Sequence, residues 1–389
     1  MNLGRTVLSQ LLDFLPRHEF NLCVRRYQGD RRVRRFSCLS QFLALMFAQL
    51  TGRHSLRDIE TTLLAFTERL YHAGFRGPVS RSTLADANER RDWRIWGDFA
   101  AVLSARARRL YARAEFAVAL AQTAYAFDST TIDLCLALFP WAQFRQHKSA
   151  VKLHTLLDLR GNIPCFVRIS TGKVADVVVL DDLVLEAGSF YIFDRGYLDF
   201  ARLYRFTLAG AFFVTRAKRR LDFRCKRPLP VDRTTGVRSD QIINLHGPLT
   251  AKLYPQGLRR IRYVDADSGR GLVFLTNHFG LPARTIADLY RCRWQVELFF
   301  KWIKQHLHIQ AFFGTSENAV KTQVWIALST YLLAAIMKQE LRLEKSLYEI
   351  LQILSLTLFE KTPLLQVFSS ENATKQLEEE CNSLPLFEF

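Results

Sequence analysis

Three acidic residues, far apart in the chain, have oxygen ligands suited to divalent metal ions. Asp128 interrupts a β-rich segment, Asp194 directly follows the apolar run Phe190–Phe193, and Glu297 lies in a helical pattern. No cysteine or histidine cluster accompanies these carboxylates, so they suit Mg²⁺ or Mn²⁺ rather than Zn²⁺. Two such ions can activate water or a 3′-hydroxyl and stabilise the leaving oxygen of a phosphoryl transfer. Asp128, Asp194 and Glu297 are therefore candidate catalytic and metal-binding residues.

Each aspartate also has a simpler interpretation. Asp128 precedes Ser-Thr-Thr and Asp194 precedes Arg-Gly, and both contexts are typical of turn-forming aspartates. Asp133 and Asp199 are nearby carboxylates that could take their places. Whether each aspartate is catalytic or only forms a turn depends on the strands and helices that position it.

The segment around Glu297 has the pattern of one long helix. It begins at Pro282, which suits a first helical turn, and no Gly or Pro interrupts it before about His308. A broad apolar face runs along it, formed by Leu289, Val296, Phe299, Phe300, Ile303 and Leu307. We expect this face to pack against protein and to hold the carboxylate rigidly.

A second, polar stripe lies beside the apolar face. At about 100° per residue, Tyr290, Arg293, Glu297 and Lys304 fall within an arc of roughly 60°. One narrow stripe thus carries a phenol, a guanidinium, a carboxylate and an ammonium. Because Glu297 and Lys301 are four residues apart, the stripe is also compatible with an ordinary solvated helix face.

The spacing Tyr-x2-Arg-x3-Glu-x6-Lys resembles the signature of bacterial insertion-sequence transposases of the DDE type. The resemblance covers about Ala124 to His308 and includes Asp128 and Asp194-x-Gly196. It implies a cut-and-paste enzyme that binds the terminal inverted repeats of a mobile element and cleaves and joins strands with Mg²⁺ or Mn²⁺. It further implies a homodimeric synaptic complex on double-stranded DNA. The DNA contacts on this helix would be Tyr290, Arg293, Lys301 and Lys304.

The remaining pattern predicts an α/β core. Strands are expected at 124–134, 150–159, 163–170, 190–193 and 211–215, with helices at 176–186 and 198–208. The first three strands should form an antiparallel unit, and the order β-β-β-α-β-α-β followed by a helix is ribonuclease-H-like, a mixed sheet with flanking helices. Each aspartate would then stand at a strand end, close to the glutamate of the final helix.

We divide the chain into regions by their patterns. Residues 1–118 form an all-helical DNA-binding domain and residues 119–314 the catalytic core. A basic β-rich insertion at 216–281 interrupts the core, and residues 315–389 form a C-terminal helical region. The insertion lies between the second aspartate and the glutamate, as the resemblance also implies.

The N-terminal region contains two candidate DNA-binding features. A polar turn is flanked by Arg25, Arg26, Arg31, Arg32, Arg34 and Arg35, and arginine suits bidentate phosphate contacts. The segment Ser80–Asn88 is similar to a helix-turn-helix reader. A solubilising charged loop and an ordinary turn between helices remain the alternatives.

Composition agrees with a polyanionic partner. The net charge of +17 and the pI near 9.8 favour nucleic acid, although charge alone does not distinguish DNA from RNA or an anionic membrane. Seven irregularly spaced cysteines indicate a reducing compartment. No apolar run is expected to span a membrane, so we predict a cytoplasmic, nucleoid-associated protein.

Two other functions remain open. A domesticated transposase could serve as a non-catalytic DNA-binding protein, but all three acidic residues are present. A nuclease with the same core would cut DNA without rejoining it.

Overall fold

The computed structural model describes residues 4–369 apart from 76, 115, 147, 267 and 307–311. Leu307 and His308 of the predicted helix and positions 370–389 of the predicted C-terminal region lie outside the described residues. The chain divides into two compact units, one formed by Met1–Leu110 with Ile303–Phe389 and the other by Tyr111–Trp302.

The first unit is helical in all its described elements. From the N-terminal side these are α1 (Val7–Leu11), η1 (Leu12–Phe14), α2 (Arg17–Arg26), α3 (Cys38–Leu50), α4 (Leu56–Ala65), α5 (Thr67–Leu70), α6 (Arg81–Arg90) and α7 (Arg94–Tyr111). The C-terminal segment adds α12 (Glu317–Glu340), α13 (Leu347–Thr357) and α14 (Leu364–Phe368). Serine side chains cap several of these helices; Ser80, for example, accepts the Thr83 amide and confirms the predicted helix start.

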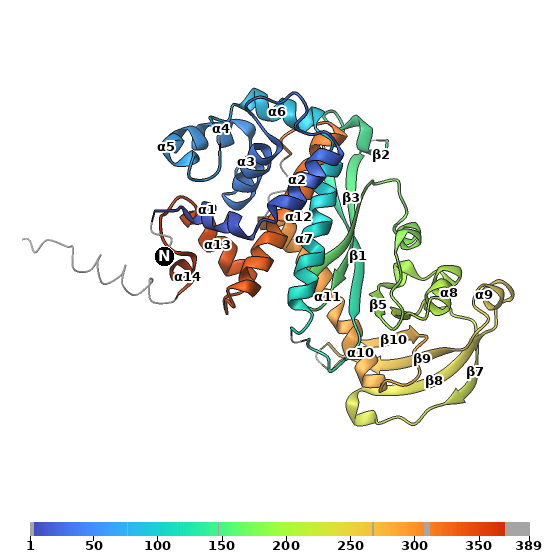
Figure 1. Ribbon diagram of the computed structural model, residues 1–389. Helices are drawn as coiled ribbons and strands as arrows, with labels where there is room; N and C mark the ends of the chain where they lie inside the picture. The colour runs from blue at the N-terminus through green and yellow to red at the C-terminus, as the bar shows by residue number, and fades with distance from the viewer. Residues whose placement is uncertain are drawn as a thin grey trace, which may run out of the picture. The chain divides into compact units, whose positions relative to one another are not determined.

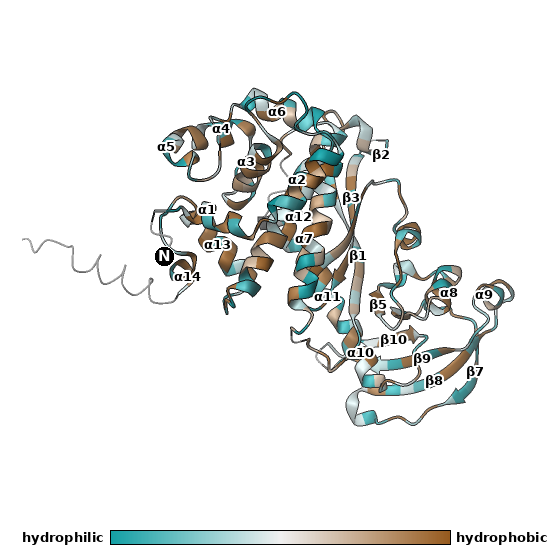
Figure 2. Ribbon diagram, in the orientation of Figure 1, coloured by the Kyte–Doolittle hydropathy of each residue, from teal (hydrophilic) through white to brown (hydrophobic). Residues whose placement is uncertain are grey.

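The expectation that no apolar run is long enough to span a membrane does not hold for helix α12. It has 24 residues and is apolar enough to pass that test by length and composition. It packs against α3, α6 and α13, and most of its side chains are buried. Figure 2 shows α3 and α12 as mainly hydrophobic. A helix that is apolar on all sides is typical of a protein core, where neighbouring elements cover it.

The second unit is built on one mixed sheet. Its first strands are β1 (Ala124–Leu134), β2 (Gln143–Arg145), β3 (Lys148–Asp158), β4 (Ile163–Thr171), β5 (Phe190–Phe193) and β6 (Phe212–Arg216). β3 pairs antiparallel with β1 and β4, whereas β1, β5 and β6 are parallel neighbours. This is the predicted ribonuclease-H-like order. The expected helix at 176–186 is the 3₁₀ helix η3 (Asp176–Asp182), and α8 (Phe200–Leu208) connects β5 to β6 through the short turn η4 (Arg195–Tyr197).

The β-rich insertion continues the same sheet. Strands β7 (Phe223–Pro228), β8 (Val237–Leu245), β9 (Leu258–Val264) and β10 (Gly271–Thr276) follow with η5 (Arg233–Thr235) and α9 (Pro248–Leu253). β10 pairs antiparallel with β6, and the order β10-β9-β8-β7 can be followed in Figure 1. One cation of the insertion is internal: Arg259 is only 4% exposed and forms an ion pair of 2.6 Å with buried Asp240. Arg259 thus supports the fold.

The two faces of the sheet have different roles. Tyr125 and Phe127 of β1 join an apolar cluster with Tyr191 and Phe193 of β5 and with residues of η3 and α8. Successive side chains on a strand point to opposite faces. The residue that follows Phe127, which is Asp128, therefore belongs to the face away from this cluster.

Candidate active site

Asp128 and Asp194 are brought together by the parallel pairing of β1 and β5. The last paired residues of these strands are Ala126 and Ile192. Asp128 and Asp194 each lie two residues further along, so the same register continued would set them side by side. Neighbouring strands are about 4.8 Å apart, which puts the two carboxylates in one small region.

The prediction that each aspartate stands at a strand end is right for Asp194 and wrong for Asp128. β5 ends at Phe193, and Asp194 caps η4 by accepting the Arg195 amide at 2.7 Å. Asp128 lies in the middle of β1, because β1 continues past β5 through its antiparallel pairing with β3. The carboxylate of Asp128 still lies near the other two, because it bonds to Arg293 and its charge interacts with those of Asp194 and Glu297.

The helix that carries Glu297 is interrupted at one residue. α10 (Ala283–Cys292) and α11 (Trp294–His306) are separated by Arg293. The backbone of Arg293 stays in the right-handed helical region, but its backbone hydrogen bonds join residues three apart instead of four. The predicted single helix is therefore two helices. The predicted apolar face is confirmed where it is described, with Leu289, Val296, Phe299, Phe300 and Ile303 all buried.

Arg293 connects two of the three carboxylates. Its Nη1 donates to Asp128 at 2.7 Å and its Nη2 donates to Glu297 at 2.6 Å. The side chain is 13% exposed, and its Nε has no partner among the described residues. Charge-assisted bonds of this kind are strong in a partly buried setting. The guanidinium therefore acts as the counter-ion of both carboxylates.

Tyr290 holds the third carboxylate. Its hydroxyl donates to Asp194 at 3.2 Å, and its ring packs 4.9 Å from that of Phe274. Burial raises the pKa of the phenol to about 12, and the charge of Asp194 adds to the rise, so the hydroxyl keeps its proton. Arg293 lies 5.7 Å from the ring centre. Tyr290, Arg293 and Glu297 thus converge, as the polar stripe predicted.

The surroundings of Asp128 disfavour its charged form. Burial raises its pKa, and the charges of Glu297 and Asp194 add to this rise, while the Ser129 amide and Arg293 oppose it. Tyr197, which was not predicted as a site residue, also contributes. Its buried hydroxyl lies 3.5 Å from Asp128, at the limit of a hydrogen bond. The only available signal was its place three residues after Asp194.

The alternative aspartates have other partners or positions. Asp199 caps α8 by accepting the Arg202 amide at 3.0 Å, and it pairs with the Arg202 guanidinium at 2.9 Å. Asp133 is exposed on β1, opposite Ala150 of β3. Neither residue contacts Arg293, Tyr290 or the three carboxylates through a described hydrogen bond.

Two residues of the predicted DNA-binding set lie further along α11. Lys301 is exposed. Lys304 is half-buried and lies in the part of the helix that belongs to the first unit. They stay predictions, as do the DNA contacts assigned to Tyr290 and Arg293.

The donor set suits a hard divalent cation. The carboxylates supply oxygen ligands, and a guanidinium already stands in for a cation between Asp128 and Glu297. Among the described residues, no three acidic, histidine or cysteine side chains are gathered closely enough to hold a metal ion as they stand. Release of Arg293 would free one oxygen on each of the two carboxylates, and the side chains would have to rearrange before they could hold an ion together.

Comparison with known families identifies the class of this chain. Residues 120–333 match the family described as Transposase DDE domain, and residues 3–76 match a domain of unknown function (DUF4372). The first match covers more than half of the chain. The chain therefore belongs to the DDE transposase family.

Individual relatives agree with this assignment. A chain of Sinorhizobium fredii, y4zB, is 32% identical over 288 residues, covering 73% of this chain and 79% of the relative, and its name describes a transposase. A Geobacillus stearothermophilus chain named as the transposase of insertion sequence element IS5377 is 34% identical over 207 residues, covering 53% and 54%.

A solved structure of a piggyBac transposase synaptic complex with hairpin DNA also resembles this chain. The TM-score is 0.45 at 10% identity, over 97% of this chain and 85% of that one. A likeness of this degree carries no conclusion about the present site.

Proposed function

We propose that this protein is a DNA transposase that binds the terminal inverted repeats of an insertion sequence and catalyses metal-dependent strand cleavage and strand transfer. Asp128, Asp194 and Glu297 would be its catalytic residues and would hold Mg²⁺ or Mn²⁺. One observation carries the proposal: Arg293 bonds to Asp128 and Glu297, Tyr290 bonds to Asp194, and the Tyr290 ring lies 5.7 Å from the Arg293 guanidinium, so two neighbouring side chains hold all three carboxylates.

The bound ions would supply a Lewis acid for the attacking and leaving oxygens of the phosphoryl transfer. The contribution of the protein is the arrangement of the ligands. Tyr290 orients Asp194 through its hydroxyl, and the cap on η4 fixes the same carboxylate from the backbone side. Arg293 keeps Asp128 and Glu297 from repelling each other before the cation arrives.

Arg293 has a second role in this proposal. When the guanidinium leaves the carboxylates, Arg293 remains a largely buried cation next to the place where a phosphate would react. A phosphate of the DNA backbone is the natural new partner, because guanidinium binds phosphate and carboxylate in the same bidentate manner. Tyr290, Lys301 and Lys304 would extend this contact along the DNA.

The partner would be double-stranded DNA, both as transposon ends and as target, held by a homodimer in a synaptic complex. The positive net charge of the chain supports such a partner, since each phosphate contact releases counterions. Cytoplasmic, nucleoid-associated localisation follows from the same function.

The test uses the purified full chain with DNA that ends in the repeats of its own element. We expect nicked ends and joined products with Mg²⁺ or Mn²⁺, and neither product in excess chelator. Cleavage without joined products would instead indicate a nuclease. Binding without cleavage in any of these ions would indicate a non-catalytic DNA-binding protein.

A further inference from the structure

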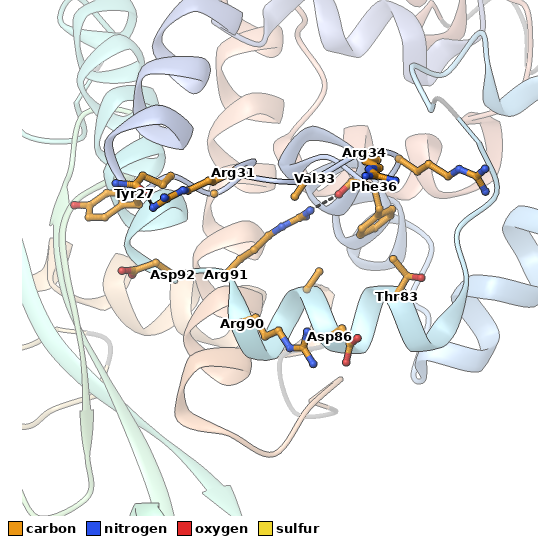
Figure 3. Close-up of a pocket in the computed structure, with 14 residues that line it drawn as sticks. Tyr27, Arg31, Val33, Arg34, Phe36, Thr83, Asp86, Arg90, Arg91 and Asp92 are labelled. Carbon is orange, nitrogen blue, oxygen red and sulfur yellow. Dashed lines mark hydrogen bonds between the residues drawn. The ribbon is translucent and has the colours of Figure 1, made fainter.

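A basic pocket of about 470 Å³ lies within the helical unit, formed by residues of the first unit alone. One wall is the loop between α2 and α3, and the other is α6 (Figure 3). Five arginines line the pocket, namely Arg31, Arg34, Arg35, Arg90 and Arg91. The arginine-rich turn and the capped helix, which the sequence offered as separate DNA-binding candidates, thus meet in one place.

The loop is held in a fixed conformation. Gln28 and Arg32 have φ values of 53° and 60°, in the left-handed region that residues other than glycine rarely adopt. A Cβ on Gly29 would lie 2.5 Å from Ile95, so the turn fits its support closely. Asp30 accepts the Cys38 amide at 2.6 Å. Backbone strain that the surroundings maintain is common at binding sites, and it preorganises this wall of the pocket.

Arg91 joins the two walls and leaves its positive charge poorly neutralised. Its side chain is only 9% exposed, and it donates to the Phe36 carbonyl, to the Ser37 carbonyl at 3.1 Å and to Gln41 at 2.9 Å. The carboxylate nearest to it, Asp30, is 3.9 Å away. A buried cation surrounded mainly by neutral oxygens favours an anion nearby.

The other arginines are available to a ligand. Arg34, Arg35 and Arg90 are exposed and form no ion pair with any described residue. Two aspartates also line the pocket, but Asp92 is paired with Arg94 at 2.5 Å, which leaves Asp86 as the one carboxylate opposing them among the lining residues. The pocket therefore carries an excess of unpaired positive charge.

We propose that this pocket binds consecutive phosphates of a DNA strand, with Arg34 and Arg35 on one side and Arg90 on the other. Arg31 and Arg34 lie apart along the loop wall (Figure 3), an arrangement that matches an extended polyanion better than a single small anion. Arg91 is a positioning residue that ties the loop to α6. The choice of DNA as the polyanion rests on the proposed function.

The experiment is phosphate ethylation interference with the full chain and element-end DNA, in chelator so that no cleavage occurs. The test variant is the double change Arg34→Gln and Arg35→Gln. The matched control is Arg17→Gln with Arg57→Gln, which removes the same charge from exposed arginines of α2 and α4 that form no ion pair within the described part of the chain. Arg90→Gln probes the opposite wall and serves if the double variant folds poorly.

We expect ethylation at one or two adjacent phosphates to weaken binding by wild type and by the control, but not by the pocket variants. The slope of log affinity against log salt should fall by about one to two units in the double variant, since each lost phosphate contact removes about 0.9. An interference pattern identical to wild type in the double variant and in Arg90→Gln would overturn the proposal. A second result would also overturn it: wild type binds inorganic phosphate or dAMP saturably, the pocket variants lose this binding, and the interference pattern on DNA stays unchanged.

Failure here is distinguishable from failure of the proposed function. If wild type cleaves its ends while the pocket variants keep the full interference pattern, only the pocket assignment is wrong. If the pocket contacts DNA as expected but no metal supports cleavage, only the transposase activity is wrong.

Discussion

The guanidinium of Arg293 and the carboxylate of Asp128 stand 165 positions apart in the chain and meet at 2.7 Å. The same guanidinium bonds to Glu297 at 2.6 Å, so a cation of the protein already lies between two predicted metal ligands. Any metal ion that binds both carboxylates has to compete with it. Metal binding by the two carboxylates therefore depends on whether the Arg293 guanidinium is bound to them or to another partner.

Removal of this competitor should strengthen metal binding in the absence of DNA. We expect Arg293→Ala to bind Mn²⁺ on the order of tenfold more tightly than wild type, because about 1.4 kcal/mol corresponds to a tenfold change and charge-assisted hydrogen bonds contribute about that much. Calorimetric titration measures the affinity. Arg291→Ala is the matched control, since Arg291 lies two residues earlier in the chain and pairs with a different carboxylate, Asp265, at 3.0 Å. Equal or weaker Mn²⁺ binding by Arg293→Ala would refute the competition.

Tyr290→Phe isolates the hydrogen bond to Asp194. The ring would keep its packing against Phe274, so the fold should persist while Asp194 loses one of its anchors. We expect the single-turnover rate of strand cleavage to fall roughly tenfold, which corresponds to a loss of about 1.4 kcal/mol of transition-state stabilisation. Tyr254→Phe removes a comparable buried hydroxyl, bonded to Thr207 at 2.7 Å, and should leave the rate unchanged. Equal rates for both variants would assign Tyr290 to packing alone.

His154 makes the stability of the second unit depend on pH. The imidazole of this β3 residue is fully buried, and its Nε2 lies 2.8 Å from the Ser170 hydroxyl. Burial lowers its pKa to about 4, against roughly 6.5 in an unfolded chain. The unfolded state therefore binds the extra proton first, and folded stability falls as the pH drops from about 6.5 towards 4.

This loss should be reduced in His154→Gln, which cannot take up the proton. Urea denaturation at pH 7 and pH 4.5 gives the comparison, and His18→Gln, at an exposed position of α2, is the control. A wild-type loss of stability that His154→Gln does not diminish would show that other groups cause it.

Much of the site could be predicted from the sequence because it depends on short-range patterns. A strand that ends at Phe193 delivers the next residue, Asp194, to a sheet edge, and helical periodicity aligns Tyr290 with Arg293 and Glu297. Such patterns need only the local period and the residue types.

The features that escaped prediction depend on tertiary pairing. Asp128 lies inside β1 because the antiparallel partner β3 carries the strand beyond β5, and no local pattern encodes the relative lengths of two neighbours. Asp128 is contacted by Arg293 and by Tyr197, which lie 165 and 69 positions further along the chain, and no local sequence pattern predicts such contacts. The pairing of β10 with β6, which makes the insertion part of the sheet, has the same origin.

The most direct test of the account is metal-dependent cleavage of element-end DNA by five single variants of the full chain. Asp128→Asn, Asp194→Asn and Glu297→Gln keep the shapes of the side chains but remove the charge that a metal ion requires. Each should cut at least about a thousandfold more slowly than wild type in Mg²⁺ and in Mn²⁺, a loss of about 4 kcal/mol. Asp133→Asn and Asp199→Asn should stay within about tenfold of wild type, because an asparagine can still cap α8. Cleavage within tenfold of wild type by any of the first three variants, or its loss in a folded Asp133→Asn or Asp199→Asn protein, would contradict the assignment of the catalytic carboxylates.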